Sequence, residues 1–357
     1  MNQTRRNFIK ILGSSAVILA ATGAGLTSFA LTRTPTDALK PWEIAGGDAY
    51  QDPRMKALSY AILAPNPHNR QPWIVDLNTE DEITIYCDLD KLLPETDPFN
   101  RQITIGLGCF LEILSLAANN DGFNTVITAF PEGFNNDHLD KRPVARVKLS
   151  QSATLTPDPL FKQVLTRRSN KEPFNMNRPL PMQKLEALAT AARDDLFVKT
   201  NNDERFVKNM RDLTWRAHSI ESLTPHTMQE SIDLMRIGKA EINANPDGID
   251  LGGGFLEGLN AVGILTRESM VDQNSDAFAT GMDMYNEILT SAMGYLWITT
   301  SGNSRIDQLK TGRSYVRLNL KATELGIAFH PISQALQEYP EMANLYDELH
   351  ETVQAKD

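Results

Sequence analysis

Basic and hydroxyl side chains alternate in one short stretch near the middle of the chain. Arg167, Ser169 and Lys171 take every second position of residues 166–174, which read TRRSNKEPF. Alternate side chains of an extended segment lie on one face, and these three offer a planar fork of donors, a hydroxyl and a point charge. The pattern indicates a binding site for an anion such as a phosphate group. The alternative is a solvent-exposed basic helix end that complements the helix dipole.

A second stretch, residues 64–73, reads APNPHNRQPW and combines prolines with amide side chains. Pro65 and Pro67 fix their backbone φ angles, so the loop can approach a ligand with little loss of entropy. Asn66 lies between them and can present its backbone N–H to that ligand. The alternative is a turn that ends the preceding helix and places Trp73 in the core, since proline disfavours helix at the residue before it.

Three more polar residues of this loop suit the edge of a flat heterocyclic ring. Asn69 and Gln71 carry amides, which both donate and accept hydrogen bonds. His68 is the one titratable residue expected beside such a ring, where it can donate a proton to a substrate. A loop histidine that caps the backbone is the other interpretation of His68, and the sequence favours neither.

Together the two stretches resemble signature segments of the nitroreductase family of FMN-dependent oxidoreductases. In the usual member, FMN lies between two subunits of a homodimer, and the proline-rich loop belongs to the partner. Here one chain carries each segment once, as in the Acg-like subfamily, in which two nitroreductase-like halves are fused. The resemblance implies an α+β fold of nitroreductase type, with two pseudo-symmetric halves, 53–150 and 151–357, around one FMN site.

The resemblance also assigns roles to individual residues. The basic stretch is expected to contact the phosphate and ribityl chain of FMN, and the proline-rich loop the isoalloxazine ring. The expected cofactor-binding residues are Pro65, Asn66, Pro67, His68, Asn69, Gln71, Arg167, Arg168, Ser169 and Lys171. No catalytic side chain is assigned, because the flavin carries the electron chemistry, and no metal site is expected.

The function implied by this resemblance is that of an FMN-dependent oxidoreductase acting on a small electron-accepting molecule. The alternative within the fused subfamily is a protein that binds and sequesters flavin with little or no turnover. A third option is a cofactor-free envelope protein that uses the fold as a scaffold. The formal net charge of -10 disfavours a nucleic-acid partner.

The N-terminus resembles a twin-arginine export signal. Residues 4–10 read TRRNFIK, and an apolar run extends from Ile11 to Leu31. The resemblance implies export by the twin-arginine translocase to the periplasm or another extracytoplasmic site, where NAD(P)H is scarce. Residues 1–31 are then a signal that is cleaved after Ala30 or kept as a membrane anchor, since the apolar run is nearly long enough to span a bilayer.

Hydrophobic periodicity places both stretches between regular elements. After a leader at 32–52 without a clear period, the first half is expected to contain helices at 53–63 and 102–119 and strands at 73–77, 82–88, 125–130 and 144–149. Beyond a linker at 150–158, the second half is expected to contain helices at 159–167, 182–192, 204–220, 228–244, 275–289, 308–325 and 346–357 and strands at 295–299 and 327–332. Cys87 and Cys109 are expected to be buried thiols rather than a disulfide.

Two features of the second half bear on its role. Residues 228–270, which include the glycine-rich stretch 246–258, are expected to form either a lid over the flavin or an ordinary surface excursion. Residues 305–327 match 101–123 at eight positions, each pair being 204 residues apart (305 minus 101) and one pair being a mid-helix glycine. The resemblance makes these the central helices of an intramolecular pseudo-dimer, whereas any two amphipathic helices that end in glycine share part of this pattern.

Overall fold

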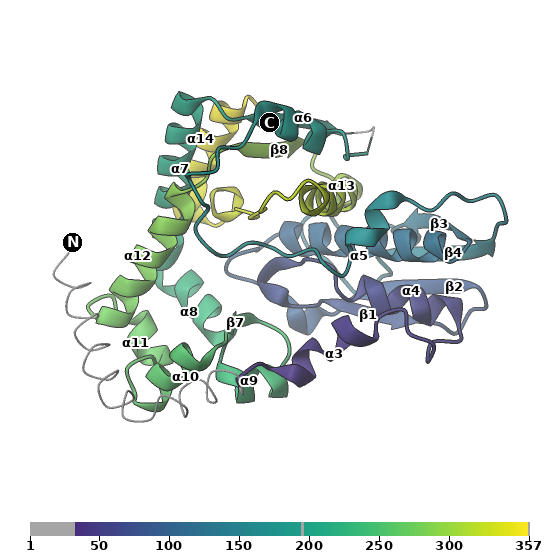
Figure 1. Ribbon diagram of the computed structural model, residues 1–357, viewed down its shortest axis with the longest axis horizontal. Coiled ribbons are helices and arrows are strands. Elements are labelled where there is room, and N and C mark those ends of the chain that lie inside the picture. Colours follow the sequence, from purple (N-terminus) through teal and green to yellow (C-terminus); the bar gives the residue numbers. More distant parts are fainter. Residues whose placement is uncertain (1–32, 194–195, 356–357) are drawn as a thin grey trace.

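The computed structural model describes residues 33–193 and 196–355, which form a mixed α+β fold (Figure 1). The export signal or anchor expected at 1–31 lies outside the described residues. The described helices are α3 (Thr36–Ile44), α4 (Pro53–Ala61), α5 (Arg101–Asn120), α6 (Met182–Ala189), α7 (Glu204–Leu223), α8 (Pro225–Asp233), α9 (Gly238–Ala244), α10 (Gly254–Ala261), α11 (Arg267–Val271), α12 (Asp276–Thr290), α13 (Arg305–Glu324) and α14 (Ala343–Val353). The described strands are β1 (Trp73–Asp76), β2 (Glu82–Cys87), β3 (Phe123–Ala129), β4 (Ala145–Gln151), β5 (Phe197–Asn201), β6 (Met235–Ile237), β7 (Ile249–Leu251) and β8 (Tyr295–Thr299).

The first half is an antiparallel sheet packed on a long helix. Its strands are ordered β1-β2-β4-β3. Ile83, Ile85 and Cys87 are buried, as expected for the apolar positions of 82–88, but Thr84 between them is buried as well. Trp73 of β1 packs against Phe110 of α5, with ring centroids 4.9 Å apart. By length and composition α5 could cross a membrane, but most of it is buried in this core.

The second half contributes a smaller antiparallel sheet of β5 and β8. Strand β5 was not expected from the sequence. An apolar residue is normally predicted to be buried, but Phe197 of this strand is 66 % exposed. Apolar and polar residues therefore do not alternate as they would in the sequence of a half-buried strand. Figure 1 shows β8, α6, α7 and α14 on one side of α13, and α5 with the four-stranded sheet and α4 on its other side. Cys87 and Cys109 are free, buried thiols, as expected.

The two halves meet where α5 and α13 cross at a pair of glycines. A Cβ atom on Gly312 would lie 1.9 Å from the carbonyl oxygen of Ile105, and one on Gly108 would lie 2.2 Å from that of Leu309. Glycine alone has no Cβ, so it permits this approach of two backbones. In the repeat, Ile105 corresponds to Leu309 and Gly108 to Gly312. Gly312 thus contacts Ile105, and the corresponding Gly108 contacts the corresponding Leu309. Such reciprocal, or exchanged, contacts are those of a two-fold symmetric interface.

Two arginines repeat this exchange at the start of the same helices. Arg101 of α5 donates to the carboxylate of Glu338 (3.0 Å) and to the carbonyl oxygen of Leu336. Arg305 of α13, which is almost fully buried, donates to the carbonyl oxygen of Phe99 (2.6 Å). Each central helix therefore begins with an arginine that binds the opposite half of the chain.

The structure departs from the sequence-based expectations on both sides of the basic stretch. The prediction of a strand at 327–332 is wrong, since this segment is not part of a sheet. The carbonyl oxygen of Phe329 in this segment accepts a hydrogen bond from the backbone N–H of Asn170 (2.8 Å). The helix expected at 159–167 is limited to a 3-10 turn, Pro159–Gln163. The chain leaves the helical path after this turn and buries Arg167.

Other differences concern the segments around α3, α9 and α14. The single helix expected at 228–244 is divided into α8, β6 and α9, because Gly238 has a left-handed φ of 76° and β6 pairs in parallel with β7. The stretch 246–258 contains β7 and the start of α10 rather than only a loop. The leader at 32–52 contains α3, and the helix expected at 346–357 begins at Ala343 and ends at Val353.

The 228–270 segment has a small hydrophobic core of its own. Its buried members are Ile232, Ile237 and Met270. The carboxylate of Glu230 accepts hydrogen bonds from the backbone N–H and the hydroxyl of Thr96 in the first half (2.9 and 2.6 Å). The segment is thus a packed unit attached to the first half.

We expect Gly312→Ala to destabilise the protein, because the new methyl group meets a backbone carbonyl that cannot turn away. Overpacking of this kind costs ~1–3 kcal/mol or more of unfolding free energy, measurable by denaturant titration. Gly281→Ala in α12 is the matched control, since no atom lies within 4 Å of its added Cβ, and it should stay within ~1 kcal/mol of the parent. Equal unfolding free energies for the two variants would contradict a tight crossing.

Candidate functional site

The two stretches singled out in the sequence meet in the structure, although they lie far apart in the chain. The guanidinium group of Arg167 donates to the carbonyl oxygen of Leu63 (3.0 Å) and to the side-chain oxygen of Asn319 on α13 (3.0 Å). Leu63 directly precedes the proline-rich loop, residues 64–73. The basic stretch, the loop and α13 therefore share one meeting point, which we call the Arg167 junction.

Arg167 is buried without a negatively charged partner. The residue is only 5 % exposed, and both of its hydrogen-bond acceptors are neutral oxygens. Its Nε atom is buried and makes no hydrogen bond to the described residues. Burial lowers the pKa of the guanidinium group. Because an unpaired buried cation is costly, the junction favours an anion that supplies the missing charge.

The other two alternating residues of the basic stretch also lie at the junction. Ser169 lies close to the buried hydroxyl of Tyr315 on α13 and interacts with it, although the geometry is not that of an ordinary hydrogen bond. Lys171 is exposed to solvent, and its positive charge acts on the rings of His68 and His330. The stretch is held in place by the backbone hydrogen bond between Asn170 and the 327–332 segment.

Two neutral histidines flank Lys171. His68 belongs to the proline-rich loop and His330 to the 327–332 segment. Burial, together with the charge of Lys171, lowers the pKa of each ring to about 4, so both are neutral at pH 7. The Nδ1 atom of each ring is buried without a partner among the described residues. A neutral imidazole has one donor and one acceptor nitrogen, so each ring can offer a hydrogen bond to a ligand.

The unpaired polar atoms of the junction come from separate segments that converge there. Buried polar groups in folded proteins are nearly always hydrogen-bonded, so several unpaired ones at one place indicate a polar ligand. The atoms are Arg167 Nε, Tyr315 Oη, His68 Nδ1 and His330 Nδ1. A ligand with an anionic group and hydrogen-bonding heteroatoms would satisfy them.

Arg168 contacts the leader helix at Trp42, whose ring centroid also lies 5.9 Å from the guanidinium carbon of Arg167. The guanidinium group of Arg168 donates to the carbonyl oxygens of Leu165 (2.9 Å) and Arg167 (2.6 Å). It also lies 4.2 Å from the centroid of the Trp42 ring on α3, in cation–π geometry. Its side chain therefore binds the leader helix, and its backbone carbonyl oxygen accepts a hydrogen bond from Asn319 (3.4 Å).

The proline-rich loop has a tight, internally braced backbone. His68, Asn69 and Gln71 adopt left-handed φ angles of 47°, 50° and 52°, which residues other than glycine rarely adopt. The side-chain oxygen of Asn66 accepts a hydrogen bond from the N–H of Gln71 (2.8 Å) and closes the loop. The loop rests on Gly106 of α5, where an added Cβ would lie 3.0 Å from Asn66 and 3.1 Å from the Pro67 ring. Pro65 precedes this contact and is half-buried.

The two amides expected at a ring edge are bound to the 228–270 segment instead. The side-chain nitrogens of Gln71 and Asn69 both point at the carbonyl oxygen of Pro246, at 2.6 and 3.5 Å. The N–H of Gly248 donates to the backbone carbonyl of Asn69 (3.2 Å). The side-chain nitrogens of both amides are thereby engaged with the turn at Pro246.

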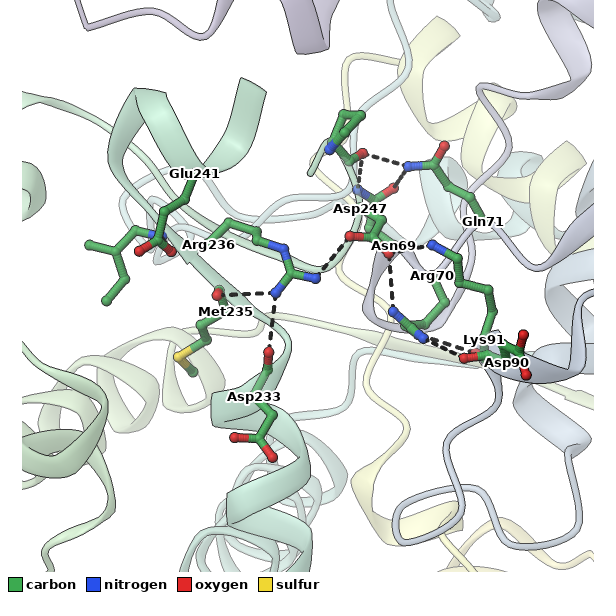
Figure 2. A network of polar contacts seen from close by, with 12 residues as sticks. Asn69, Arg70, Gln71, Asp90, Lys91, Asp233, Met235, Arg236, Glu241 and Asp247 are labelled. Carbon is green, nitrogen blue, oxygen red and sulfur yellow. Dashed lines mark hydrogen bonds and ion pairs between the residues drawn. The ribbon is translucent and has the colours of Figure 1, made fainter. Parts of the chain in front are cut away.

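A charged network lies directly beside these amides (Figure 2). Asp247 accepts hydrogen bonds from Arg70 (3.1 Å) and Lys91 (2.5 Å) in the first half and from Arg236 (2.9 Å) in the 228–270 segment. Arg70 also donates to the carbonyl oxygens of Asp90 and Lys91 (both 3.1 Å). The network fixes the turn around Asp247 on the proline-rich loop.

Several residues of the junction were not predicted from the sequence. Tyr315 and Asn319 are four positions apart on α13 and so lie on one face of the helix, which is the only local signal for them. His330 and Trp42 carry no such signal, because the 327–332 segment and α3 are placed by tertiary contacts. Among the described residues, no group of three or more His, Cys, Asp or Glu side chains is arranged to hold a metal ion.

No protein-family model matches the chain, and no curated protein matches it. Function therefore has to be argued from the geometry of the Arg167 junction.

The neutral state of His330 predicts a pH dependence of stability. The ring has a pKa of about 4 in the folded protein against an ordinary value of 6.5. Between these values the unfolded chain takes up the proton first, so the unfolding free energy falls as pH falls, by up to ~1.4 kcal/mol per pH unit. The variant His330→Gln lacks this loss. We therefore expect the stability of the parent relative to that of the variant to decrease between pH 6.5 and 4.

The comparison of parent and variant cancels the titration of groups that do not interact with His330, and denaturant titrations at several pH values measure it. His218, whose pKa the charge of His330 lowers, is the exception. The exposed His138, which lies outside the junction, is replaced by Gln as a control for the general effect of removing a histidine. A constant difference between the parent and His330→Gln across this pH range would show that His330 is not held neutral.

Proposed function

We propose that this chain is an exported, nitroreductase-like oxidoreductase that binds one FMN at the Arg167 junction and acts on a small electron-accepting molecule. The observation that carries the proposal is the buried, unpaired cation Arg167, which joins the basic stretch to the proline-rich loop. These two stretches are the ones whose sequences resemble the family. The hydrogen bond from Arg167 to Leu63, the residue before the loop, brings the two stretches close together and supports a single ligand shared between them.

The chemistry of the basic stretch fits the phosphate end of FMN. That phosphate carries nearly two negative charges at neutral pH and accepts several hydrogen bonds. Arg167 has a free donor, Lys171 an exposed ammonium group and Ser169 a hydroxyl. Hydrogen bonds to charged groups are the stronger kind, so these three residues are the ones proposed to hold the phosphate.

The loop fits the ring end. Bound flavin would supply the hydride and electron chemistry, and the residues around it would position it and handle protons. Pro65, Asn66 and Pro67 present a stiff backbone on Gly106, which suits a flat ring. His68, which is neutral at pH 7, can donate a hydrogen bond through one ring nitrogen and accept one through the other.

The exchanged contacts between α5 and α13 support two related halves in one chain. The hairpin-like pair β1–β2 precedes α5, and the antiparallel pair β5–β8 precedes α13 in the same way. The proposed arrangement is an intramolecular pseudo-dimer in which the first half supplies the loop and the second half supplies the basic stretch. The twin-arginine export and the extracytoplasmic location remain proposals from residues 1–31.

The alternative function, flavin sequestration, is favoured by one specific observation. Asn69 and Gln71 are bound by the carbonyl oxygen of Pro246, and the turn around it covers the loop. A substrate would have to reach the ring through this cover. A protein that held flavin without turnover would need no such access.

We expect Lys171→Gln and Arg167→Gln to weaken FMN binding by the full-length protein. Loss of one charged hydrogen bond costs ~1.5–3 kcal/mol, so the dissociation constant for FMN should rise roughly tenfold or more for each variant. Quenching of FMN fluorescence measures it. Lys171 is exposed, and its replacement should leave the fold intact.

The matched control is Lys162→Gln, which removes an exposed lysine on the turn before the basic stretch. Its FMN affinity should equal that of the parent. If Lys171→Gln and Lys162→Gln bind FMN equally well, the phosphate assignment is wrong. A protein that takes up no added FMN at all would exclude both flavin functions and leave the scaffold role.

Turnover separates the oxidoreductase from the sequestering protein. We expect the FMN-loaded protein, once reduced chemically under anaerobic conditions, to recover its visible absorbance quickly on addition of a quinone or a nitroaromatic compound. Absorbance that stays bleached with every small acceptor would favour sequestration. Free FMN under the same conditions provides the reference rate.

A further inference from the structure

The turn at 245–253 carries one carboxylate, that of Asp247, which three cations surround. Two of these cations belong to the first half and attach the turn to it. Asp247 binds Arg70, Lys91 and Arg236 at 3.1, 2.5 and 2.9 Å (Figure 2). Its side chain is 14 % exposed and those of the two arginines 10 % and 16 %. The ion pairs are therefore largely shielded from water, where they are stronger than on a surface.

The charges of this cluster do not balance. Three cations face one carboxylate, and the remaining oxygens bound to them are backbone carbonyls of Asp90, Lys91, Asp233 and Met235. The carboxylate of the nearby Glu241 is engaged with Arg267 and a backbone N–H. The Nε atom of Arg236 is buried without a partner among the described residues. Among the described residues, Asp247 is thus the one carboxylate bonded to all three cations, while the charge of Glu241 also acts on Arg236. A free donor, Arg236 Nε, remains in the cluster.

The position of the cluster connects it to the loop. Asp247 lies between Pro246 and Gly248, which hold the side chains of Gln71 and Asn69 and the backbone of Asn69. Release of Asp247 would free these contacts together. The rest of the 228–270 segment has separate attachments, such as Glu230 to Thr96 and the pairing of β7 with β6. Residues 245–248 can therefore move off the loop while β7 and the segment stay in place.

We propose that Asp247 is an electrostatic latch on the 245–253 turn, and that Arg70, Lys91 and Arg236 form an anion site that a divalent oxyanion can enter in its place. Such an anion neutralises two of the three cations, whereas Asp247 neutralises one. Its entry releases the turn and frees the Asn69 and Gln71 amides. The latch does not require flavin, but its consequence for access to a ring rests on the proposed function.

Hydrogen exchange of the full-length protein without added FMN tests the latch directly. The amide of Gly248, which donates to Asn69 across the latch, reports opening; the amide of Gln71, which donates to Asn66 within the loop, reports the loop itself. In Asp247→Asn, exchange at Gly248 should be roughly tenfold faster or more, as loss of charged hydrogen bonds requires. Exchange at Gln71 should change much less.

The probe for the anion site is inorganic sulfate, compared with chloride at equal ionic strength. Sulfate should accelerate exchange at Gly248 in the parent more than chloride does, and this difference should disappear in Asp247→Asn. Asp250→Asn is the matched control, since Asp250 lies on the same turn, is exposed and binds only the N–H of Gly252 within it. It should behave like the parent.

Unchanged exchange at Gly248 in Asp247→Asn would overturn the latch. Equal effects of sulfate and chloride on the parent would overturn the anion site. If Asp247→Asn fails to fold, Lys91→Gln takes its place, because the Lys91 side chain is 32 % exposed and its replacement is easier for the fold to accommodate. Exchange at Gly248 as slow in Lys91→Gln as in the parent would then overturn the latch. None of these outcomes depends on FMN binding, so they are distinct from failure of the proposed function.

Discussion

The close crossing of α5 and α13 is the constraint on which the rest of the structure depends. Gly108 and Gly312 bring the two backbones into contact, and each helix carries one wall of the Arg167 junction. The proline-rich loop rests on α5 at Gly106, and Asn319 of α13 receives the side chain of Arg167. The distance between the loop and the basic stretch is therefore determined by a contact between two helices in which glycines let the backbones touch.

The loop is in contact with two cationic sites, the Arg167 junction and the cluster around Asp247. The two sites differ in whether the chain itself supplies a negative charge to the cations. At the Arg167 junction the described residues provide only neutral oxygens. At the second site the chain provides a carboxylate of its own, Asp247. The first arrangement favours an external anion, whereas the second favours an internal one. The loop therefore contacts both the proposed ligand site and the proposed latch, and its amides take part in the latch.

The sequence was informative where local residue types determine the structure. The stretches at 64–73 and 166–174 were recognisable because prolines, amides and alternating basic residues stand next to one another, and the central helices because their pattern repeats. Prediction failed where tertiary contacts decide. The 327–332 segment has the alternation of a strand but no neighbouring strand to pair with, and His330 faces the junction only because the backbone of this segment is bonded to Asn170.

The exchanged contacts between the halves have a consequence for how this chain could diversify. In a dimer of identical subunits, every substitution at the interface appears twice and must be compatible with itself across the symmetry axis. Within one polypeptide each surface changes alone, and dilution cannot separate the partners. The two antiparallel strand pairs have diverged in this way. Strand β1 leads after a short turn into β2, whereas β5 and β8 are separated in the chain by the elements from α7 to α12.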